Sequence, residues 1–584
     1  MMTYPTPQPA AVSNEMWGSD VVAQTVRALG YRYISLVPGA SFRGLHDSLV
    51  NHLGNTDPRM IVCLHEEHAV SIADGYSRVA DEPMAVALHS NVGLMHATMT
   101  IFNAWCDRRP MLILGATGPM DAHKRRPWID WIHTAQDQAS LIRPYIKWDN
   151  QPASPEAAVE AVLRADQIAR TSPYGPVYVC LDAEMQEGAL ERETRVPPVN
   201  RYRPGAAPEA SHSDVRETCD ALRHASFPVI LIGRGARGQA EWDARVRLAE
   251  AAGAVVLTTT HNAAAFPTEH PAHILPPVGE RPTDEETRLL RQADLIVSLD
   301  WHDLAGFLSA RLGASQTQAP TGAKVIHCSL DRYMANGWSM DHQALPAVDL
   351  PVLALPDRFV AQLLDALEGQ APQAMRAPEG FGHWTEAPLP VPTKRFGAEQ
   401  MAYTLAEFAK ARPITFARLS FGWPQRACRF RSPLDFLGKD GGGAVGTGPG
   451  HTIGAALALR DSGRLVVGVM GDGDYLMGVN ALWTAANMRI PLLIVVANNR
   501  SYYNDEVHQE RVAKQRGRPV ENKWIGQRLS DPDVDLVAMA RAQGFTGEGP
   551  VHSAEELRSA FERGAAIVES GGCHLIDARI EPGY

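Results

Sequence analysis

Two short polar segments carry residues that could bind a phosphate group and a metal ion. Gly471-Asp472-Gly473-Asp474 follows an apolar run, and Asn499 stands at the end of the next apolar run. Gly471 and Gly473 let the backbone approach a phosphate closely. Asp472, the side-chain oxygen of Asn499 and a nearby backbone carbonyl are hard oxygen ligands of the kind that Mg²⁺ prefers. Together the segments predict a site for magnesium and phosphate.

Both segments are expected at the carboxyl ends of parallel strands. Residues 465–470 and 491–497 are short apolar runs typical of buried strands. Open parallel sheets bind ligands where such strands end. The alternative is a tight turn at 471–474 and an unrelated loop at 498–499, but an asparagine pair directly after the next strand favours the ligand site.

Glu66 lies at a predicted junction between a strand and a helix. An apolar helical stripe that includes Ala69 and Ala73 places Glu66 in the first helical turn, where a carboxylate could simply interact with the helix dipole. His65 and His68 are an alternative metal site. The zinc-protease spacing His-Glu-x-x-His is absent, however, because the second histidine comes one residue early.

The remaining sequence supplies the elements that must position these groups. Short apolar strands alternate with amphipathic helices, which predicts an α/β protein of three tandem domains, each with a doubly wound parallel sheet. The predicted domains are residues 1–190, 209–368 and 393–584, separated by Pro-rich linkers at 191–208 and 369–392. The first helix is expected from Asp20 to Leu29, with Ser19 as its N-cap.

Composition excludes several classes of protein. The chain has 584 residues, 45% of them hydrophobic, so it can bury several cores. Its net charge of −11 makes nucleic acid and anionic membranes unlikely partners. No apolar run is long enough to span a membrane, and the first fourteen residues lack the basic start of a signal peptide. The seven cysteines form no Cys-x-x-Cys pair, and we expect a reducing, cytoplasmic location.

The Gly-Asp-Gly segment followed by paired asparagines resembles the thiamine diphosphate enzymes of the superfamily that includes pyruvate decarboxylase, benzoylformate decarboxylase and acetolactate synthase. The resemblance implies thiamine diphosphate and Mg²⁺ as cofactors. It implies that Asp472, Asn499 and the carbonyl of Ser501 bind the metal. Residues 471–474 would bind the diphosphate.

The sequence around Glu66 is similar to the pattern of this family in which a glutamate binds N1′ of the aminopyrimidine ring. The resemblance implies that Glu66 activates the cofactor by sharing a proton with N1′. Glu67 is the neighbouring ambiguity, and the spacing to Ala69 favours Glu66. Further along, the glycine-rich segment 442–448 resembles a turn in which Gly443 offers its carbonyl to the cofactor and Val445 wedges between the two cofactor rings. Valine is smaller than the usual residue there.

Three candidates lie on the substrate side. His89 matches a histidine that faces the substrate carboxylate in benzoylformate decarboxylase-like members, although a hydrogen-bonded structural role is the alternative. Gln136 resembles a glutamine near the thiazolium in acetolactate synthase-like members, with a plain loop as the alternative. Ser41 follows Ala40 where decarboxylase relatives carry substrate contacts. Core packing is the expected role of three tryptophans, Trp105, Trp128 and Trp131.

The predicted central domain contains the pattern Gly-x-Gly-x-x-Gly at 233–238, which taken alone suggests a dinucleotide. The acidic residue that should follow the next strand is missing, so NAD is disfavoured. Some members of the superfamily keep FAD or a CoA-type ADP group in this domain, and the sequence leaves that open. Arg234 and Arg237 are expected to be solvated surface charges.

The resemblance implies an enzyme that breaks or forms the carbon–carbon bond next to a carbonyl. A 2-oxoacid decarboxylase or lyase is the leading hypothesis, and an acetolactate synthase-like carboligase and a 2-hydroxyacyl-CoA lyase are the alternatives. From a different class, a cofactor-binding paralogue without lyase activity competes with all three. Relatives build the site across a two-fold interface, so we expect a homodimer or homotetramer. The substrate, a 2-oxoacid or 2-hydroxyacyl compound, is left open.

Overall fold

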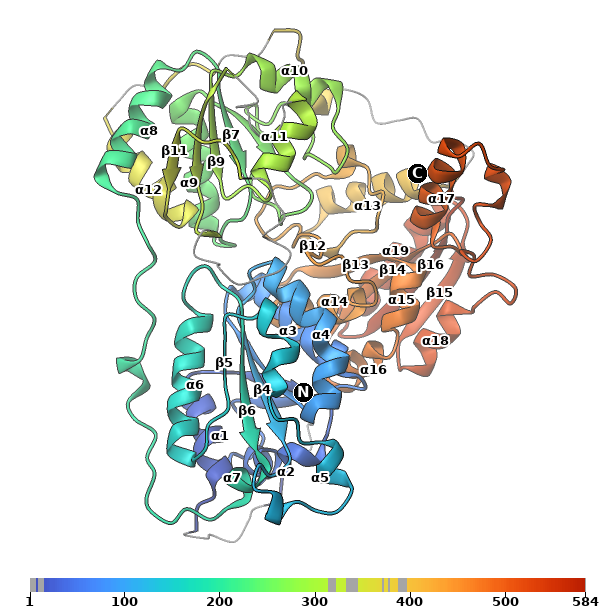
Figure 1. Ribbon diagram of the computed structural model, residues 1–584. Coiled ribbons are helices and arrows are strands. Elements are labelled where there is room, and N and C mark those ends of the chain that lie inside the picture. The colour runs from blue at the N-terminus through green and yellow to red at the C-terminus, as the bar shows by residue number, and fades with distance from the viewer. Residues whose placement is uncertain are drawn as a thin grey trace.

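A computed structural model of the protein describes residues 7–8, 15–313, 322–331, 345–369, 372–375, 379–386 and 396–582. In chain order, it forms three parallel β-sheets, each covered by helices on both faces (Figure 1). The predicted fold class is therefore confirmed. The exact domain boundaries stay a prediction, and the second predicted linker, 369–392, lies partly outside the described residues.

The N-terminal sheet has six strands in the order β2-β1-β3-β4-β6-β5. Its central strands are fully buried because helices cover both faces. The strands are β1 (Tyr33–Leu36), β2 (Arg59–Val62), β3 (Met84–Leu88), β4 (Met111–Thr117), β5 (Trp148–Asn150) and β6 (Pro176–Asp182). The helices are α1 (Gly18–Ala28), α2 (Arg43–Asp47), α3 (Glu66–Ala80), α4 (Ser90–Cys106), α5 (Ile129–Ile132), α6 (Pro155–Ala169) and α7 (Ala183–Glu187).

The central sheet has five strands in the order β11-β10-β9-β7-β8. It is connected to the N-terminal sheet by a long segment that includes 191–208 and runs along the side of the molecule (Figure 1). The strands are β7 (Pro228–Ile232), β8 (Val255–Thr258), β9 (Leu295–Leu299), β10 (Lys324–Cys328) and β11 (Leu350–Val352). The helices are α8 (His212–His224), α9 (Gln239–Ala252), α10 (Asp284–Gln292), α11 (Leu304–Leu312) and α12 (Pro356–Leu367).

The C-terminal sheet has five strands in the order β12-β13-β14-β16-β15. The adjacent strands β13 and β14 end at the two polar segments of the sequence. The strands are β12 (Ile414–Arg418), β13 (Leu465–Gly471), β14 (Leu492–Asn498), β15 (Thr546–Val551) and β16 (Cys573–Arg579). The helices are α13 (Ala398–Ala411), α14 (Gly448–Ala458), α15 (Asp472–Gly478), α16 (Ala481–Asn487), α17 (Tyr503–Gln515), α18 (Leu536–Ala542) and α19 (Ala554–Glu569).

Helix α3 of the N-terminal domain packs closely against helix α14 of the C-terminal domain (Figure 1). Glycines permit this approach: a Cβ added at Gly75 would lie 2.2 Å from the carbonyl oxygen of His451, and one at Gly454 would lie 2.0 Å from that of Ile72. Buried apolar side chains from both helices share one core. The helix that begins at Glu66 is therefore firmly tied to the C-terminal domain of its own chain.

The first helix differs from its prediction. It begins at Gly18, with Trp17 as the N-cap, because the side chain of Asp20 accepts a hydrogen bond from the Trp17 N–H at 2.9 Å. Ser19 lies inside the helix, where its buried hydroxyl accepts a hydrogen bond from Ser48. The predicted cap at Ser19 is therefore wrong.

Across the described ranges, no helix is both long and apolar enough to cross a membrane. All seven cysteines are buried, and none of them forms a disulfide bond. The cytoplasmic location stays a prediction.

Candidate active site

Asp472 and Asn499 direct their side-chain oxygens to the same point. Asp472 begins α15 directly after β13, and Asn499 follows β14, so both lie at neighbouring strand ends as predicted. The backbone N–H of Ser501 donates to Asp472 Oδ2 at 3.2 Å and to Asn499 Oδ1 at 2.9 Å. Because one N–H reaches both oxygens, the two side chains converge on one small region.

The Asp472 carboxyl group is buried, at 4% exposure. Burial raises the pKa of Asp472 to about 6, and hydrogen bonds from backbone N–H groups offset part of this rise. One of these comes from Gly473 at 2.9 Å. A Cβ added at Gly473 would lie 2.5 Å from the ring of Tyr502, so only glycine fits this turn. The hydrogen bonds and the close packing hold the Asp472 carboxylate at the carboxyl end of β13.

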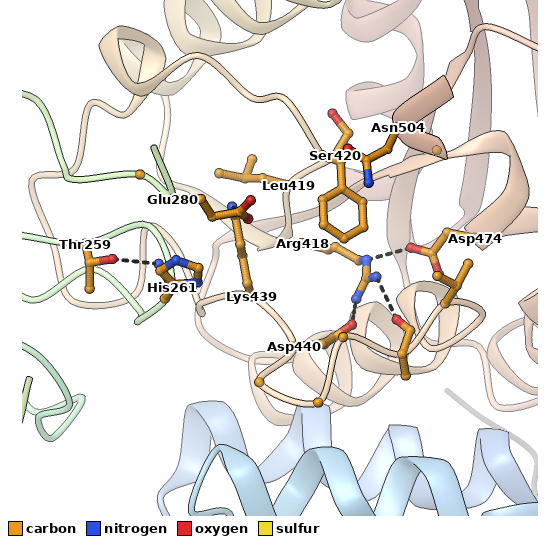
Figure 2. A pocket seen from close by; sticks show the side chains of 18 of the residues that line it. Thr259, His261, Glu280, Arg418, Leu419, Ser420, Lys439, Asp440, Asp474 and Asn504 are labelled. Atoms are coloured by element: carbon orange, nitrogen blue, oxygen red, sulfur yellow. Dashed lines mark hydrogen bonds and ion pairs between the residues drawn. The ribbon is translucent and has the colours of Figure 1, made fainter. Parts of the chain in front are cut away.

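Asp474 connects this turn to the glycine-rich segment before α14. Its Oδ1 accepts hydrogen bonds from the N–H groups of Gly446 at 2.7 Å and Gly448 at 3.2 Å, and its Oδ2 lies 2.6 Å from Nε of Arg418 (Figure 2). Gly446 has a φ of +102°, a conformation that L side chains rarely adopt. Asp474 therefore holds the segment in shape, which the sequence alone did not reveal.

A buried chain of charges continues from Arg418 toward the N-terminal domain. Arg418 pairs with Asp440 (Figure 2). Asp440 Oδ1 lies 2.8 Å from Nδ1 of His451 on α14. Nε2 of His451 lies 2.7 Å from Oδ2 of Asp74 on α3. Burial would lower the pKa of His451, but Asp440 and Asp74 outweigh it and raise the pKa to about 9. The imidazolium thus bridges two carboxylates across the interface between domains.

A cavity of about 780 Å³ opens beside these turns. Its walls include Gly443, Val445 and Asp472 from the C-terminal domain and His261 from the central domain, as Figure 2 shows in part. A Cβ added at Gly443 or Gly471 would meet no atom within 4 Å, so both glycines face open space. Val445 is 38% exposed at the rim. The cavity can take a sizeable ligand along the predicted cofactor-binding segments.

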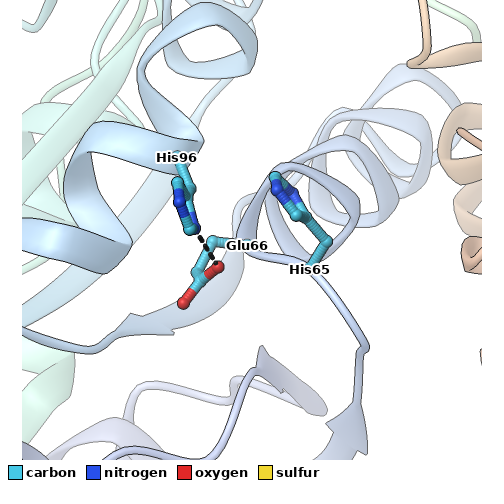
Figure 3. Close-up of side chains that lie close together, drawn as sticks. All are labelled: His65, Glu66 and His96. Carbon is cyan, nitrogen blue, oxygen red and sulfur yellow. Dashed lines mark hydrogen bonds and ion pairs between the residues drawn. The ribbon is translucent and has the colours of Figure 1, made fainter. Parts of the chain in front are cut away.

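Glu66 begins α3, directly after the N-cap His65, as the sequence predicts. Its Oε2 lies 3.0 Å from Nδ1 of His96 on α4 (Figure 3). Its Oε1 lies 3.2 Å from the position that a Cβ of Gly93 would take, so the glycine leaves room for the carboxyl group. Glu66 is not among the described residues that line the cavity beside Asp472. Within one chain, the two predicted halves of the site are therefore not brought into one pocket.

His89 is held by Ser41, which lies on the short 3₁₀ helix η1 (Ala40–Phe42). The Ser41 N–H donates to Nδ1 of His89 at 3.4 Å, and the Ser41 hydroxyl lies 2.8 Å from the same nitrogen. Ser90 N–H donates to that hydroxyl oxygen at 3.0 Å, so the Ser41 proton points to His89. Two donors on Nδ1 leave the ring proton of neutral His89 on Nε2.

The electrostatics of His89 favour its neutral form. Burial lowers the pKa of His89, and the neighbouring His133, whose ring centroid lies 4.7 Å away, lowers it further. His133 lies close to Gln136 in the chain, and the sequence did not predict its contact with His89. Gln136 is exposed, and its role stays a prediction.

Two tryptophan predictions are wrong. Trp105 is buried as expected, but Trp128 and Trp131 are 70% and 69% exposed. Trp128 is the N-cap of α5 and Trp131 lies within it, a single short turn in which Asp130 is the buried residue. Their ring centroids lie 5.8 Å apart, so they contact each other at the surface.

In the central domain, aspartate side chains of the protein accept hydrogen bonds from the backbone N–H groups of the glycine-rich loop 233–238. The N–H of Ala236 donates to Asp357 at 2.7 Å, and that of Arg237 donates to Asp81 of the N-terminal domain at 3.0 Å. Arg234 pairs with Asp300, with Nε 2.8 Å from a carboxylate oxygen. The prediction of solvated arginines is therefore wrong: both are largely buried, and the Arg237 guanidinium donates to the backbone carbonyls of Ala264 and Pro433.

Comparison with protein families matches all three domains. Residues 16–141 match the N-terminal TPP binding domain, 215–360 the central domain and 420–578 the C-terminal TPP binding domain of thiamine pyrophosphate enzymes. The chain belongs to the thiamine pyrophosphate enzyme family. It is therefore a thiamine pyrophosphate-dependent enzyme, and the resemblance noted in its sequence is confirmed.

Curated relatives of this thiamine pyrophosphate enzyme include both carboligases and decarboxylases. A probable acetolactate synthase large subunit of Methanocaldococcus jannaschii is 24% identical over 97% of this chain and 92% of its own length. Benzoylformate decarboxylase of Pseudomonas aeruginosa is 25% identical over 87% of this chain and 90% of its own length.

Solved structures share the fold of this thiamine pyrophosphate enzyme. A thiamine diphosphate-dependent 4-hydroxybenzoylformate decarboxylase of Rhodococcus jostii covers 97% of this chain and 100% of its own, with a TM-score of 0.77 and 20% identity. Benzoylformate decarboxylase of Polynucleobacter necessarius has the same TM-score, with 21% identity, and covers 97% of this chain and 99% of its own.

Proposed function

We propose that this enzyme binds thiamine diphosphate with Mg²⁺ at the ends of β13 and β14. Asp472, Asn499 and the Ser501 carbonyl would hold the metal, and residues 471–474 would hold the diphosphate. The observation that carries this proposal is the convergence of Asp472 Oδ2 and Asn499 Oδ1 on one N–H group. Two oxygens within reach of each other suit a small hard cation. Open space beside Gly471 supports a diphosphate there.

When bound, the cofactor supplies a thiazolium carbon acid that can add to a carbonyl group. The chain would contribute the groups around it. Glu66 would hold a proton at N1′ of the aminopyrimidine ring, the Gly443 carbonyl would accept from its amino group, and Val445 would pack between the two rings. Glu67 is the less favoured alternative to Glu66, because the spacing to Ala69 favours Glu66.

The reaction we propose is cleavage of a 2-oxoacid with release of CO₂, as in a benzoylformate decarboxylase. Support comes from Ser41 and His89, whose hydrogen bonds leave a donor at His89 Nε2. A neutral donor next to a substrate carboxylate could orient it and later donate a proton. Gln136 remains a further candidate on the substrate side.

An acetolactate synthase-like carboligation is the second candidate, and the relatives include several enzymes of that name. A 2-hydroxyacyl-CoA lyase is a third. A cofactor-binding paralogue without lyase activity is the alternative from a different class. Glu66 argues against it, because a protein that only binds the cofactor has no need of the activating carboxyl group.

We also propose that the working enzyme is at least a dimer, in which Glu66 of one chain completes the cavity of another. Glu66 is absent from the described lining of its own chain's cavity. Exposed apolar side chains on α4, and others beside the cavity, would favour association of two chains. On α4, Val92, Met95 and Met99 are exposed on one helical face, and Val445 and Met477 are exposed beside the cavity.

The test is a screen of 2-oxoacids and 2-hydroxyacyl-CoA compounds with enzyme, thiamine diphosphate and Mg²⁺. We expect CO₂ from an aromatic or branched 2-oxoacid, with an aldehyde as the second product. Adding an acceptor aldehyde or a second 2-oxoacid distinguishes the carboligase, whose product would contain a new carbon–carbon bond. The absence of CO₂ and of aldehyde with every compound, together with tight cofactor binding, would favour the non-catalytic paralogue.

A further inference from the structure

His96 makes a close contact with Glu66 that neither the motif nor the family comparison assigns. The two residues lie on different helices, α4 and α3, and Nδ1 of His96 lies 3.0 Å from Oε2 of Glu66 (Figure 3). The Glu66 side chain is only 10% exposed, whereas that of His96 is 58% exposed. Glu66 Oε2 therefore has a titratable partner, while Oε1, beside Gly93, is left for another ligand.

These residues and His65 form a cluster of two histidines and a carboxylate, which raises the alternative of a metal site. Ring orientation argues against it. The rings of His65 and His96 are stacked, with centroids 4.8 Å apart and planes 19° from parallel. The lone pair of an imidazole nitrogen lies in the ring plane, so two stacked rings cannot both aim at one ion. The hydrogen bond from His96 to Glu66 is the better account.

Of the described titratable groups in contact with His96, Glu66 is the one that shares a hydrogen bond with it. His65 accepts the Glu67 N–H at its Nδ1, at a distance of 3.1 Å, so this nitrogen is unprotonated. Burial lowers the pKa of His65, and the neighbouring His96 lowers it further. His65 thus stays neutral and stacked. His68 lies beyond it, in contact with His65.

We propose that His96 is an internal proton donor to Glu66. When His96 carries a proton on both ring nitrogens, the pair is an imidazolium and a carboxylate. When a ligand and a second chain cover it, the pair loses water, and desolvation disfavours the two charges. The N–H bond at His96 Nδ1 then breaks and an O–H bond forms at Glu66. Glu66 so becomes the protonated carboxyl group that an aminopyrimidine nitrogen requires, and His96 becomes neutral.

This inference rests on the proposed function, because it takes Glu66 as the partner of the cofactor ring. His96 acts through Glu66 and is therefore a positioning residue. The source of the proton on Glu66 can be measured without enzyme turnover. If the proton comes from His96, cofactor binding at pH 6 takes up about one proton per site fewer in the wild type than in a variant that lacks the imidazole. If it comes from water, the two proteins take up the same number of protons.

The experiment is calorimetry of thiamine diphosphate binding, with Mg²⁺ present, in pairs of buffers that differ in ionisation enthalpy, from pH 6 to pH 8. As the pH falls from 8 to 6, we expect proton uptake in the wild type to fall below that of His96→Asn, which keeps a hydrogen-bond donor but cannot titrate, by up to about one proton per site. Any proton that Asp472, whose pKa is raised to about 6, releases on metal binding is common to both proteins and cancels in this difference. His52→Asn, an exposed histidine elsewhere in the domain, is the control and should match the wild type.

Equal proton uptake in wild type and His96→Asn would overturn the proposal. If His96→Asn does not bind the cofactor, His96→Gln gives the same comparison with a longer amide. The variant Glu66→Gln distinguishes a failure of the His96 role from a failure of the proposed function. If Glu66→Gln takes up as many protons as the wild type at pH 8, then Glu66 is not the cofactor's partner and the proposed function fails. If it takes up about one proton fewer than the wild type at pH 8, while His96→Asn matches the wild type at pH 6, only the role of His96 fails.

Discussion

Asp474 Oδ1 accepts a hydrogen bond of 2.7 Å from the N–H of Gly446, so the turn after β13 fixes the loop before α14. These residues lie 28 positions apart in the chain. The same carboxylate pairs with Arg418, which in turn pairs with Asp440. The loop that carries Gly443 and Val445 is thus held by a carboxylate next to the proposed metal ligand, and the two proposed cofactor-binding segments are joined to each other.

Asp474→Ala should therefore loosen the loop without removing a metal ligand. It leaves two buried N–H groups and one face of Arg418 without their acceptor, which should cost about 2–4 kcal/mol of unfolding free energy. Cofactor affinity should fall as well, because the loop is no longer held. Denaturant unfolding and calorimetry measure both. An Asp474→Ala protein as stable as wild type would contradict the structural role.

The buried bridge at His451 predicts a pH-dependent contribution to stability. The pKa of His451 is raised from 6.5 to about 9, so its contribution is fully present below pH 6.5 and is lost as the pH rises through about 9. Its partners behave in the opposite direction. The pKa of Asp74 is lowered to about 2 and that of Asp440 is held well below its usual value, so their contribution is lost only in acid.

His451→Gln should accordingly destabilise the protein by about 3 kcal/mol or more near pH 6, because it leaves two buried carboxylates without their shared cation. The difference from wild type should shrink above pH 9. Thermal unfolding from pH 5 to pH 10 measures it, with His212→Gln, an exposed residue on α8, as the matched control. A difference that stays constant across this range would argue against the bridging charge.

The sequence predicted the parts of the site that depend on local pattern. Apolar runs ending in Gly-Asp-Gly and in Asn-Asn place Asp472 and Asn499 at strand ends, and a helical stripe places Glu66 at a helix start. Both placements are confirmed, since strand ends in a parallel sheet share one edge. Their roles toward the cofactor and metal stay proposals.

Contacts between distant elements could not be predicted in the same way. His96 lies 30 residues from Glu66, and Arg418 reaches Asp440 and Asp474 through loops. Periodicity tells which face of a helix is buried but not which partner it meets. Arg237 illustrates the error: a charged residue in a glycine loop was expected in solvent, yet its backbone N–H reaches another domain.

Removal of the metal ligands should act on cofactor binding before it acts on catalysis. Loss of an outer partner of a metal ligand typically costs about 10- to 100-fold in affinity, and Asp472→Ala removes a proposed ligand itself, so its effect should be no smaller. Asn499→Ala should act in the same direction but more mildly, because it removes a neutral oxygen. Titration of Mg²⁺ at fixed thiamine diphosphate measures both. Unchanged cofactor affinity in Asp472→Ala would refute the assignment.

His89→Ala should lower turnover by about 10²-fold or more while leaving cofactor affinity unchanged, since a positioned acid or base commonly contributes that much. Ser41→Ala should have a smaller effect, because the Ser41 N–H still reaches Nδ1. Steady-state kinetics together with cofactor titration separate the two quantities. Equal losses of stability and activity in His89→Ala would favour a purely structural histidine.

The proposed assembly can be tested by mixing two inactive variants. Glu66→Gln disables the half of the site on α3, and Asp472→Ala disables the half on α15. If each site takes one half from each chain, a mixed dimer contains one site with both defects and one site with neither. Random reassociation in a two-fold dimer should then restore about a quarter of wild-type activity.

The control is each variant carried alone through the same dissociation and reassociation, which should stay inactive. A site built within one chain predicts the opposite result, because every site in the mixture would then carry one defect. The absence of regained activity, with mixed dimers demonstrated by mass spectrometry, would place Glu66 and Asp472 of one chain in the same site. Regained activity requires that a partner's Glu66 enters the cavity beside Asp472, which the separation of Glu66 from that cavity in one chain predicts.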